Sequence, residues 1–154
     1  MAAGDSISGT FEIAPAPGYA GNVTPATAWK ILESRKDAIL IDVRTRAEWS
    51  YVGLPDLESV GRKPALLEWQ VFPSMQVNPE FVAQLSGGVA DRGAPLLFLC
   101  RSGVRSAAAA RAMTEAGYSN CFNVSDGFEG PPDGKARRGS TAGWKASGLP
   151  WRQT

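Results

Sequence analysis

Short apolar runs alternate with helix-forming segments along this chain, and that alternation constrains the fold more than any other feature. The clearest runs are residues 38–43 (AILIDV), 95–99 (PLLFL) and 121–124 (CFNV). Apolar runs of this length are typical of parallel strands that are buried on both faces. Residues 65–71 (ALLEWQV) are expected to add another strand. The pattern therefore predicts an α/β domain in which helices cover both faces of a parallel sheet.

Capping signals mark the helices between these runs. Thr24 followed by Pro25 is a usual helix start, and Ala28, Ile31 and Leu32 then place apolar side chains on one helical face. The other helices are expected after Asn78 and Pro79 as far as Gly87 and Gly88, and over residues 45–50, 106–116 and 144–149.

The two ends of the chain differ in composition from its middle. Residues 1–22 are rich in Ala, Gly, Pro and Ser, and we expect them to form an N-terminal arm, either mobile or laid on the domain. Residues 23–154 then form a single domain. The basic, Gly- and Pro-rich segment 127–143 is expected to be irregular, with Lys135, Arg137 and Arg138 on a solvated loop.

The charge balance excludes several classes of partner. Lys and Arg together number 16 and Asp and Glu 15, so no overall field attracts nucleic acid or an anionic membrane surface. No apolar run approaches the roughly 20 residues that a membrane helix needs, and the N-terminus lacks the pattern of a signal peptide. We therefore expect a cytoplasmic protein that binds neither nucleic acid nor membranes.

Cysteine and histidine usage restricts the chemistry further. The chain has two cysteines, Cys100 and Cys121, and no histidine, so neither a disulfide framework nor a familiar zinc site is expected. We expect no metal and no other cofactor. Without histidine, a cysteine nucleophile must be activated by backbone N–H groups and by cationic neighbours. Cys121 lies within a predicted interior strand with no cation nearby, which favours a packing role.

Cys100 stands where such activation is available, at the end of the strand 95–99. The segment that follows, RSGVR, contains a glycine and runs into a helix N-terminus, so its N–H groups can form an anion-binding nest. The helix dipole and the charges of Arg101 and Arg105 would further stabilise a thiolate. Asp42 and Arg44 follow another strand, and the carboxyl ends of parallel strands share one edge of the sheet.

Several motifs resemble those of the single-domain rhodanese family. CRSGVRSAAAARAMTEAGYSN (residues 100–120) looks like the family's active-site loop and following helix, and DVRTRAEW (residues 42–49) resembles its DVR motif with a downstream glutamate. The C-terminal part of the family's sequence pattern is also matched here, by the segments DGFEG, GW and ASGLPW. The resemblance covers most of residues 24–151. It departs at YVGLPDLES, where the family commonly has a histidine after the glycine.

The resemblance implies a fold with a five-stranded parallel sheet and helices on both of its faces. It also implies the activity of a sulfurtransferase with a ping-pong mechanism. Cys100 would take the outer sulfur of thiosulfate or a persulfide donor and pass it to a thiophilic acceptor, either a small molecule or another protein. Arg101 and Arg105 would hold the small anionic donor, and Ser102, Gly103 and Val104 would contribute backbone N–H groups. Asp42, Arg44 and Glu48 would orient the loop, although these three are equally compatible with a purely structural ion-pair network.

Two other functions remain open at this point. A cysteine-dependent phosphatase or arsenate reductase also places a cysteine and an arginine around an anion, but its loop usually holds one residue more than the four between Cys100 and Arg105. A rhodanese-like module that binds a partner or relays sulfur to another protein is the second alternative. Inactive modules of this kind typically lose the cysteine, which this chain retains.

Overall fold

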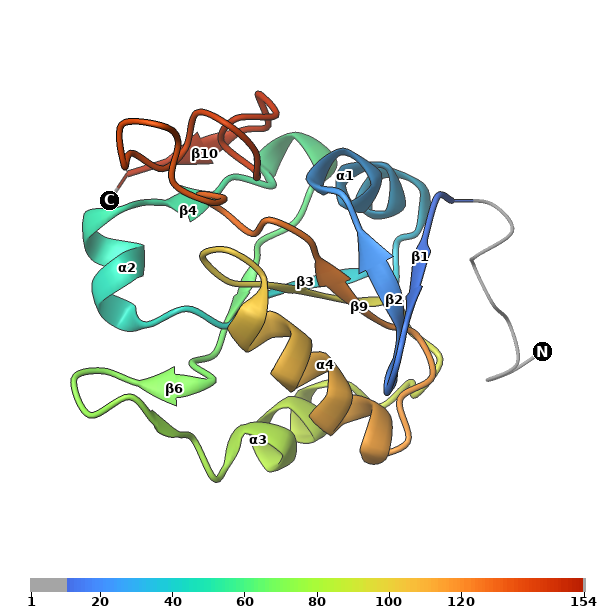
Figure 1. The fold of residues 1–154 in the computed structure, drawn as a ribbon. Coiled ribbons are helices and arrows are strands. Elements are labelled where there is room, and N and C mark those ends of the chain that lie inside the picture. Colours follow the sequence, from blue (N-terminus) through green and yellow to red (C-terminus); the bar gives the residue numbers. More distant parts are fainter. Residues whose placement is uncertain (1–10, 154) are drawn as a thin grey trace.

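A six-stranded sheet forms the centre of the domain, as the computed structural model of residues 11–153 shows (Figure 1). Its strand order is β1-β2-β9-β8-β3-β5. The strands are β1 (Ala14–Ala16), β2 (Tyr19–Val23), β9 (Cys121–Val124), β8 (Leu96–Leu99), β3 (Ile39–Asp42) and β5 (Ala65–Leu66). Strands β2, β9, β8, β3 and β5 are mutually parallel, and β1 pairs with β2 in the antiparallel sense. The predicted five-stranded parallel sheet is confirmed, with one antiparallel strand added at its edge.

The sheet separates two apolar cores because successive side chains of a strand point to opposite faces. Leu40 packs in one core with helix α1 (Pro25–Ser34), whereas Ile41 packs in the other with α3 (Phe81–Gly88) and α4 (Val104–Glu115). In the neighbouring strand β8, Leu97 and Phe98 divide between the same two cores. Figure 1 shows α1 on one side of the sheet and α3 and α4 on the other, as the sequence predicts.

Capping side chains place two helices where the sequence indicates. The Thr24 hydroxyl accepts a hydrogen bond from the Thr27 backbone N–H at 3.1 Å, and Pro25 opens α1. Thr45 and Glu48 form a reciprocal capping box that starts α2 (Arg46–Tyr51). Helix α4 begins two residues earlier than expected, at Val104, because Gly103 adopts a φ of 110° and ends the preceding loop. Helix α3 starts at Phe81, three residues after the predicted cap at Asn78.

The N-terminal region takes part in the sheet. Residues 14–22 of the expected arm contain β1 and most of β2, whose Gly21 pairs with Phe122 in β9. Gly21 has φ 152° and a Cβ there would lie 2.6 Å from the Ala14 carbonyl oxygen, so the close approach of β1 favours glycine. Residues 1–10 of the arm lie outside the described residues.

The predicted strand over residues 65–71 is wrong as one continuous strand, because only its two ends are strands and they belong to different sheets. Only β5 is a strand paired with β3, although the Leu67 and Trp69 N–H groups still donate to the Asp42 and Val43 carbonyl oxygens. The chain then forms a separate hairpin of β6 (Gln70–Val71) and β7 (Gln76–Val77). The Trp69 ring turns inward onto Phe81, with centroids 5.1 Å apart. The ladder with β3 ends at Leu66, and the Trp69 side chain packs against α3.

The predicted helix over residues 144–149 is also wrong, because residues 144–148 form turns and Leu149 has no regular structure. Gly148, within this segment, has a φ of 76°, which a right-handed helix does not adopt. The Trp144 ring is fully buried and its Nε1–H donates to the Pro150 carbonyl oxygen at 2.7 Å. The last strand, β10 (Trp151–Arg152), pairs with β4 (Leu54–Pro55). The short 3-10 helix η1 (Glu58–Val60) follows β4 in the sequence.

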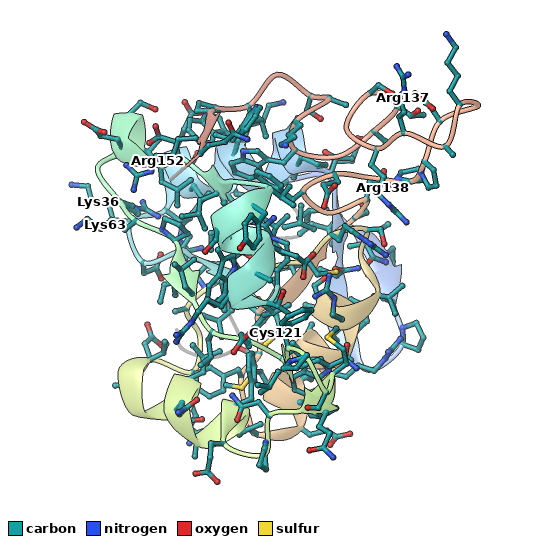
Figure 2. All side chains as sticks on the ribbon, turned by 90° about the vertical axis from the view of Figure 1, so that its left-hand side faces the viewer. Lys36, Lys63, Cys121, Arg137, Arg138 and Arg152 are labelled. Atoms are coloured by element: carbon teal, nitrogen blue, oxygen red, sulfur yellow. The ribbon has the colours of Figure 1, made fainter. Side chains whose placement is uncertain are left out.

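The basic excursion is irregular, as predicted, and a single acidic residue organises it. Asp133 accepts backbone N–H bonds from Lys135 at 2.8 Å and from Arg137 at 3.0 Å. Arg138 donates to the Gly130 carbonyl oxygen at 2.7 Å. Figure 2 shows Arg137 and Arg138 at one end of the molecule, on the loop that stands out from the sheet. Within residues 11–153, no helix combines the length and the apolar character that crossing a membrane requires.

Candidate functional site

Cys100 follows directly after β8, at the carboxyl edge of the parallel sheet. Leu99, the last residue of β8, is the register partner of Asp42 at the end of β3, and the Val43 N–H donates to the Leu99 carbonyl oxygen at 2.8 Å. The two segments that the sequence places at this edge are therefore neighbours. The Cys100 side chain lies between the sheet and α4, and the residue is only 1% exposed.

The backbone at the start of α4 faces the Cys100 sulfur. The Gly103 N–H donates a hydrogen bond to Cys100 Sγ at 3.0 Å. Gly103 is the residue before the first turn of this twelve-residue helix, so the positive end of the helix dipole adds to the field at the sulfur. Ser102 and Gly103 are partly buried, whereas Val104 is 78% exposed. The Gly103 N–H and the N-terminus of α4 therefore both face Cys100 Sγ, and no basic side chain among residues 11–153 forms a hydrogen bond with that sulfur.

Arg105 pairs with Glu48 and does not stand free in the loop. Its Nη1 donates to Glu48 Oε1 at 2.6 Å and its Nη2 donates to Oε2 at 2.9 Å. Burial alone would raise the pKa of Glu48, but the bonds from Arg105 and Thr45 outweigh it and lower that pKa to about 2. Burial likewise lowers the pKa of Arg105, and the Glu48 bonds and charge outweigh it, so that this pKa is raised. Glu48 therefore holds the first turn of α4 against α2.

Arg101 differs from Arg105 in this respect. It is exposed, and no carboxylate among residues 11–153 forms an ion pair with it. Of the two arginines expected to hold an anionic donor, Arg101 is thus the one whose charge is not neutralised by an ion pair. Arg105 keeps a long-range attraction for negative charge on Cys100.

Asp42 and Arg44 form a separate, fully buried ion pair. Arg44 Nε and Nη2 donate to the two Asp42 carboxylate oxygens at 2.9 and 2.7 Å, and Nη2 also donates to the Gly53 carbonyl oxygen. Arg44 Nη1 has no hydrogen-bond partner among residues 11–153. The guanidinium carbon lies 4.2 Å from the centroid of the Phe128 ring. The pair thus supports Phe128, and Glu48, the third member of the predicted group, acts separately on Arg105.

Residues 127–130 hold the backbone of the cysteine loop from the other side. The Phe128 N–H donates to the Cys100 carbonyl oxygen at 2.7 Å, and the Glu129 N–H donates to the Arg101 carbonyl oxygen at 3.0 Å. A Cβ on Gly127 would lie 2.4 Å from the Cys100 carbonyl oxygen. Sequence reasoning placed the irregular excursion here without foreseeing these contacts, and the glycines of DGFEG were the available signal.

A chain of polar side chains continues from Cys100 into the sheet, and sequence reasoning missed it. Ser106 Oγ lies 3.1 Å from Cys100 Sγ and donates to Asn123 Oδ1 at 2.5 Å. Asn123 Nδ2 donates to Asn22 Oδ1 at 2.9 Å, and the Tyr19 hydroxyl donates to the same oxygen at 2.8 Å. The polar Asn123 within the apolar run CFNV was the signal that could have found this chain.

Cys121 is a buried thiol in β9, in agreement with its predicted packing role. Burial raises its pKa to about 11, although a hydrogen bond with Thr114 acts in the opposite direction. Its thiol donates to the Tyr118 carbonyl oxygen at 3.6 Å. Figure 2 shows Cys121 in the lower half of the molecule, away from the labelled arginines of the basic loop. Such a thiol is a poor nucleophile at neutral pH.

A groove of about 440 Å³ opens beside the two arginines of the loop. The β6–β7 hairpin contributes Phe72 and Met75, which are 57% and 39% exposed, and α2 contributes Ala47. The remaining lining residues are Thr45, Glu48, Gln70, Arg101 and Arg105. Among residues 11–153, no three His, Cys, Asp or Glu side chains gather as a metal site requires. The groove thus has the two loop arginines in its wall, whereas Cys100 is not among its lining residues.

Comparison with known proteins places the chain in a family. Residues 20–154 match the family model described as STR4 middle domain. The crystal structure of Rv0390 from M. tuberculosis shares 48% sequence identity, with a TM-score of 0.81, over 88% of this chain and 99% of that one. A Rickettsia conorii protein described only as uncharacterized is 41% identical over 85% of this chain and 96% of its own length.

A more distant relative carries the name of an activity. The thiosulfate sulfurtransferase GlpE of Actinobacillus succinogenes is 27% identical over 83% of this chain and 86% of its own length. A structure titled as a polysulfide-sulfur transferase homodimer from Wolinella succinogenes shares the fold, with a TM-score of 0.56 at 21% identity. The chain belongs to the STR4 middle-domain family and has a rhodanese-like fold.

Proposed function

We propose that the protein is a sulfurtransferase that carries sulfur as a persulfide on Cys100. The observation that carries the proposal is the 3.0 Å hydrogen bond from the Gly103 N–H to Cys100 Sγ at the N-terminus of α4. A preorganised donor and a helix dipole aimed at one sulfur favour negative charge there, which is what a sulfur nucleophile requires. The distant relative named as a thiosulfate sulfurtransferase supports the same activity.

The reaction is a redox-neutral transfer in two steps. In the first, the Cys100 thiolate attacks the outer sulfur of thiosulfate, a new S–S bond forms, and sulfite leaves with the electrons of the old S–S bond. In the second, an acceptor thiolate or cyanide attacks the outer sulfur of the persulfide. The S–S bond to Cys100 then breaks and Sγ leaves as the thiolate. Sγ therefore carries negative charge at the start and at the end of the cycle.

The described residues divide the remaining tasks. Arg101 is the exposed cation next to the nucleophile, and it would hold the oxyanion of the donor. Arg105 is held by Glu48 and would fix the start of α4, so that the Gly103 N–H keeps its direction. Ser102 and Val104 would contribute backbone N–H groups to the outer sulfur. The physiological acceptor is either a small thiol or a protein that approaches across the groove beside Phe72.

The size of the loop favours sulfur over phosphate. Only residues 101–103 separate the cysteine from the first residue of α4, and the Gly103 N–H of this short segment already binds Sγ. A tetrahedral phosphoryl group needs a ring of donors around several oxygens, whereas the outer atom of a persulfide is a single sulfur.

Measurement of thiosulfate-to-cyanide transfer by the parent and by Cys100→Ser tests the proposal. We expect the serine variant to lose activity by at least a hundredfold, because a hydroxyl cannot form the persulfide. Cys121→Ala is the matched control and should retain most activity. A mass increase of one sulfur atom on thiosulfate-treated parent protein, absent in Cys100→Ser, would report the intermediate.

An aryl phosphate assay provides the opposing outcome. If the parent hydrolyses an aryl phosphate more efficiently than it transfers sulfur, and Cys100→Ser loses this hydrolysis, the sulfurtransferase proposal fails. If Cys100→Ser retains sulfur transfer within tenfold of the parent, the assignment of the nucleophile fails.

A further inference from the structure

The polar chain below Cys100 has a defined direction of donation. Asn123 Nδ2 donates to Asn22 Oδ1, so the oxygen of the Asn123 amide faces Ser106. That oxygen accepts the only proton of the Ser106 hydroxyl, at an O–O distance of 2.5 Å. Ser106 therefore offers Cys100 a lone pair and no donor. The neutral thiol fits this arrangement, because its S–H can donate to Ser106 Oγ at 3.1 Å.

A thiolate does not fit the same arrangement. Once the thiol proton has left to solvent, Sγ and the Ser106 oxygen would face each other as two acceptors 3.1 Å apart. Rotation of the hydroxyl about its C–O bond relieves this, because the proton then points at the sulfur. The rotation withdraws the donor from Asn123, a residue only 6% exposed, and leaves its amide oxygen without that bond.

We propose that the Ser106 hydroxyl is a two-position hydrogen-bond switch beneath Cys100, and that Asn123 is the positioning residue that sets its resting position. In the resting thiol form the hydroxyl donates to Asn123. In the anionic form of Cys100 it donates to the sulfur. The effect of the switch on sulfur transfer rests on the proposed function. In that reaction Sγ is an anion when it attacks the donor and again when it leaves the persulfide.

The positions of the residues separate this switch from the other influences on Cys100. Ser106 and Asn123 are both buried, at 0% and 6% exposure, and neither carries charge. The charged groups beside the loop include Arg101, Arg105 with its partner Glu48, the buried Asp42–Arg44 pair and Asp126. None of these side chains has a hydrogen bond to Ser106, Asn123 or Asn22 among residues 11–153. Replacement of Asn123 therefore removes a competing acceptor and leaves every charge near the sulfur in place.

The test measures the rate of Cys100 alkylation by iodoacetamide against pH, which reports the thiolate without any sulfur transfer. We expect Asn123→Leu, which is nearly isosteric, to move the midpoint of the profile down by about one pH unit, a tenfold gain in thiolate fraction. In the Ser106→Ala background the same replacement should move the midpoint by less than about 0.2 pH units, because Asn123 acts through the hydroxyl. Tyr19→Phe removes only the hydroxyl at the far end of the polar side-chain network, and it should leave the midpoint unchanged.

A second variant guards against misfolding of Asn123→Leu. Asn22→Ala leaves Asn123 in place but removes the acceptor of its Nδ2, so that the amide can turn and present its N–H₂ to Ser106. The hydroxyl is then directed to the sulfur, and the midpoint should again fall. Near-ultraviolet circular dichroism selects the variants whose packing is intact.

The outcomes separate the switch from the proposed function. The switch is overturned if folded Asn123→Leu and Asn22→Ala both keep the parent midpoint, or if the shift persists without the Ser106 hydroxyl. If the midpoints move as expected and thiosulfate transfer is absent from the parent, the switch stands and the proposed function fails. If both hold, Asn123→Leu raises kcat/KM for thiosulfate about tenfold below the parent midpoint and leaves it unchanged well above.

Discussion

Arg105 and Glu48, which lie 57 positions apart in the chain, form two parallel hydrogen bonds of 2.6 and 2.9 Å. The pair joins the first turn of α4 to α2, and Thr45 adds a further bond to the same carboxylate at 3.1 Å. Such a two-bonded contact fixes the orientation of the guanidinium as well as its position. The position of the cysteine loop therefore depends on a carboxylate contributed by a distant segment.

Glu48 should make the stability of the protein depend on pH in the acid range. Its pKa in the folded protein is lowered to about 2, so the unfolded chain binds a proton on this group at higher pH than the folded chain does. Its contribution is complete above about pH 5 and is lost as the pH falls toward 2. We expect the excess stability of the parent over Glu48→Gln to shrink by roughly 3 kcal/mol across this range.

Urea denaturation at several pH values measures this difference. Glu115→Gln, on the exposed end of α4, is the control and should differ little from the parent at any pH. A constant difference between parent and Glu48→Gln from pH 6 to pH 2 would contradict the prediction.

Arg101 should determine the affinity for an anionic donor. It is the exposed loop arginine without an ion-pair partner among residues 11–153, so its replacement removes a charge from the path of the donor. We expect Arg101→Gln to raise KM for thiosulfate about tenfold and to change kcat by less than threefold. Steady-state kinetics with Arg137→Gln as a remote control measures this. An unchanged KM would show that other groups hold the donor.

Asp42 should be essential for stability because it neutralises a fully buried arginine. Asp42→Asn keeps the shape of the side chain and leaves the Arg44 guanidinium with no negative partner at 0% exposure. We expect a loss of about 3–5 kcal/mol in the free energy of unfolding. Asp37→Asn is the matched control, because it breaks the exposed Arg35–Asp37 pair and should cost less than about 1 kcal/mol. Equal losses in the two variants would refute the prediction.

Gly127 should be required for the position of the cysteine loop as well as for its own backbone conformation. Its φ is 62°, and a methyl group there would overlap the Cys100 and Arg101 carbonyl groups at 2.4–2.5 Å. Gly61 has a similar φ of 73° but open space around it, so Gly61→Ala isolates the conformational cost of about 1–2 kcal/mol.

Thermal unfolding and sulfur transfer distinguish the two glycines. We expect Gly127→Ala to lose more stability than Gly61→Ala and to lose transfer activity by more than tenfold, because the carbonyls held by residues 128–130 must move. Gly61→Ala should keep near-parent activity. If Gly127→Ala keeps full activity, the backbone contacts of residues 127–130 do not position the loop.

Local patterns in the sequence suffice for much of this fold. The apolar runs at residues 39–42, 96–99 and 121–124 become the central strands, since a buried parallel strand needs side chains that are apolar on both faces. Thr24 and Thr45 start helices because a hydroxyl and its N–H partner lie three residues apart. The same local information places Cys100 between a strand end and a helix start.

Contacts between distant segments decided the rest. Trp69 packs against Phe81, and Trp144, in the segment expected to be a helix, packs against Trp29. Arg105 was expected to face an anion, yet Glu48 holds it, and nothing near Arg105 in sequence signals that pairing. Asn123 could be read only as a polar residue in an apolar strand until folding brought Ser106 and Asn22 to its two ends. Periodicity and capping act over a few residues, whereas the partners of a buried polar group are set by which strands and helices become neighbours.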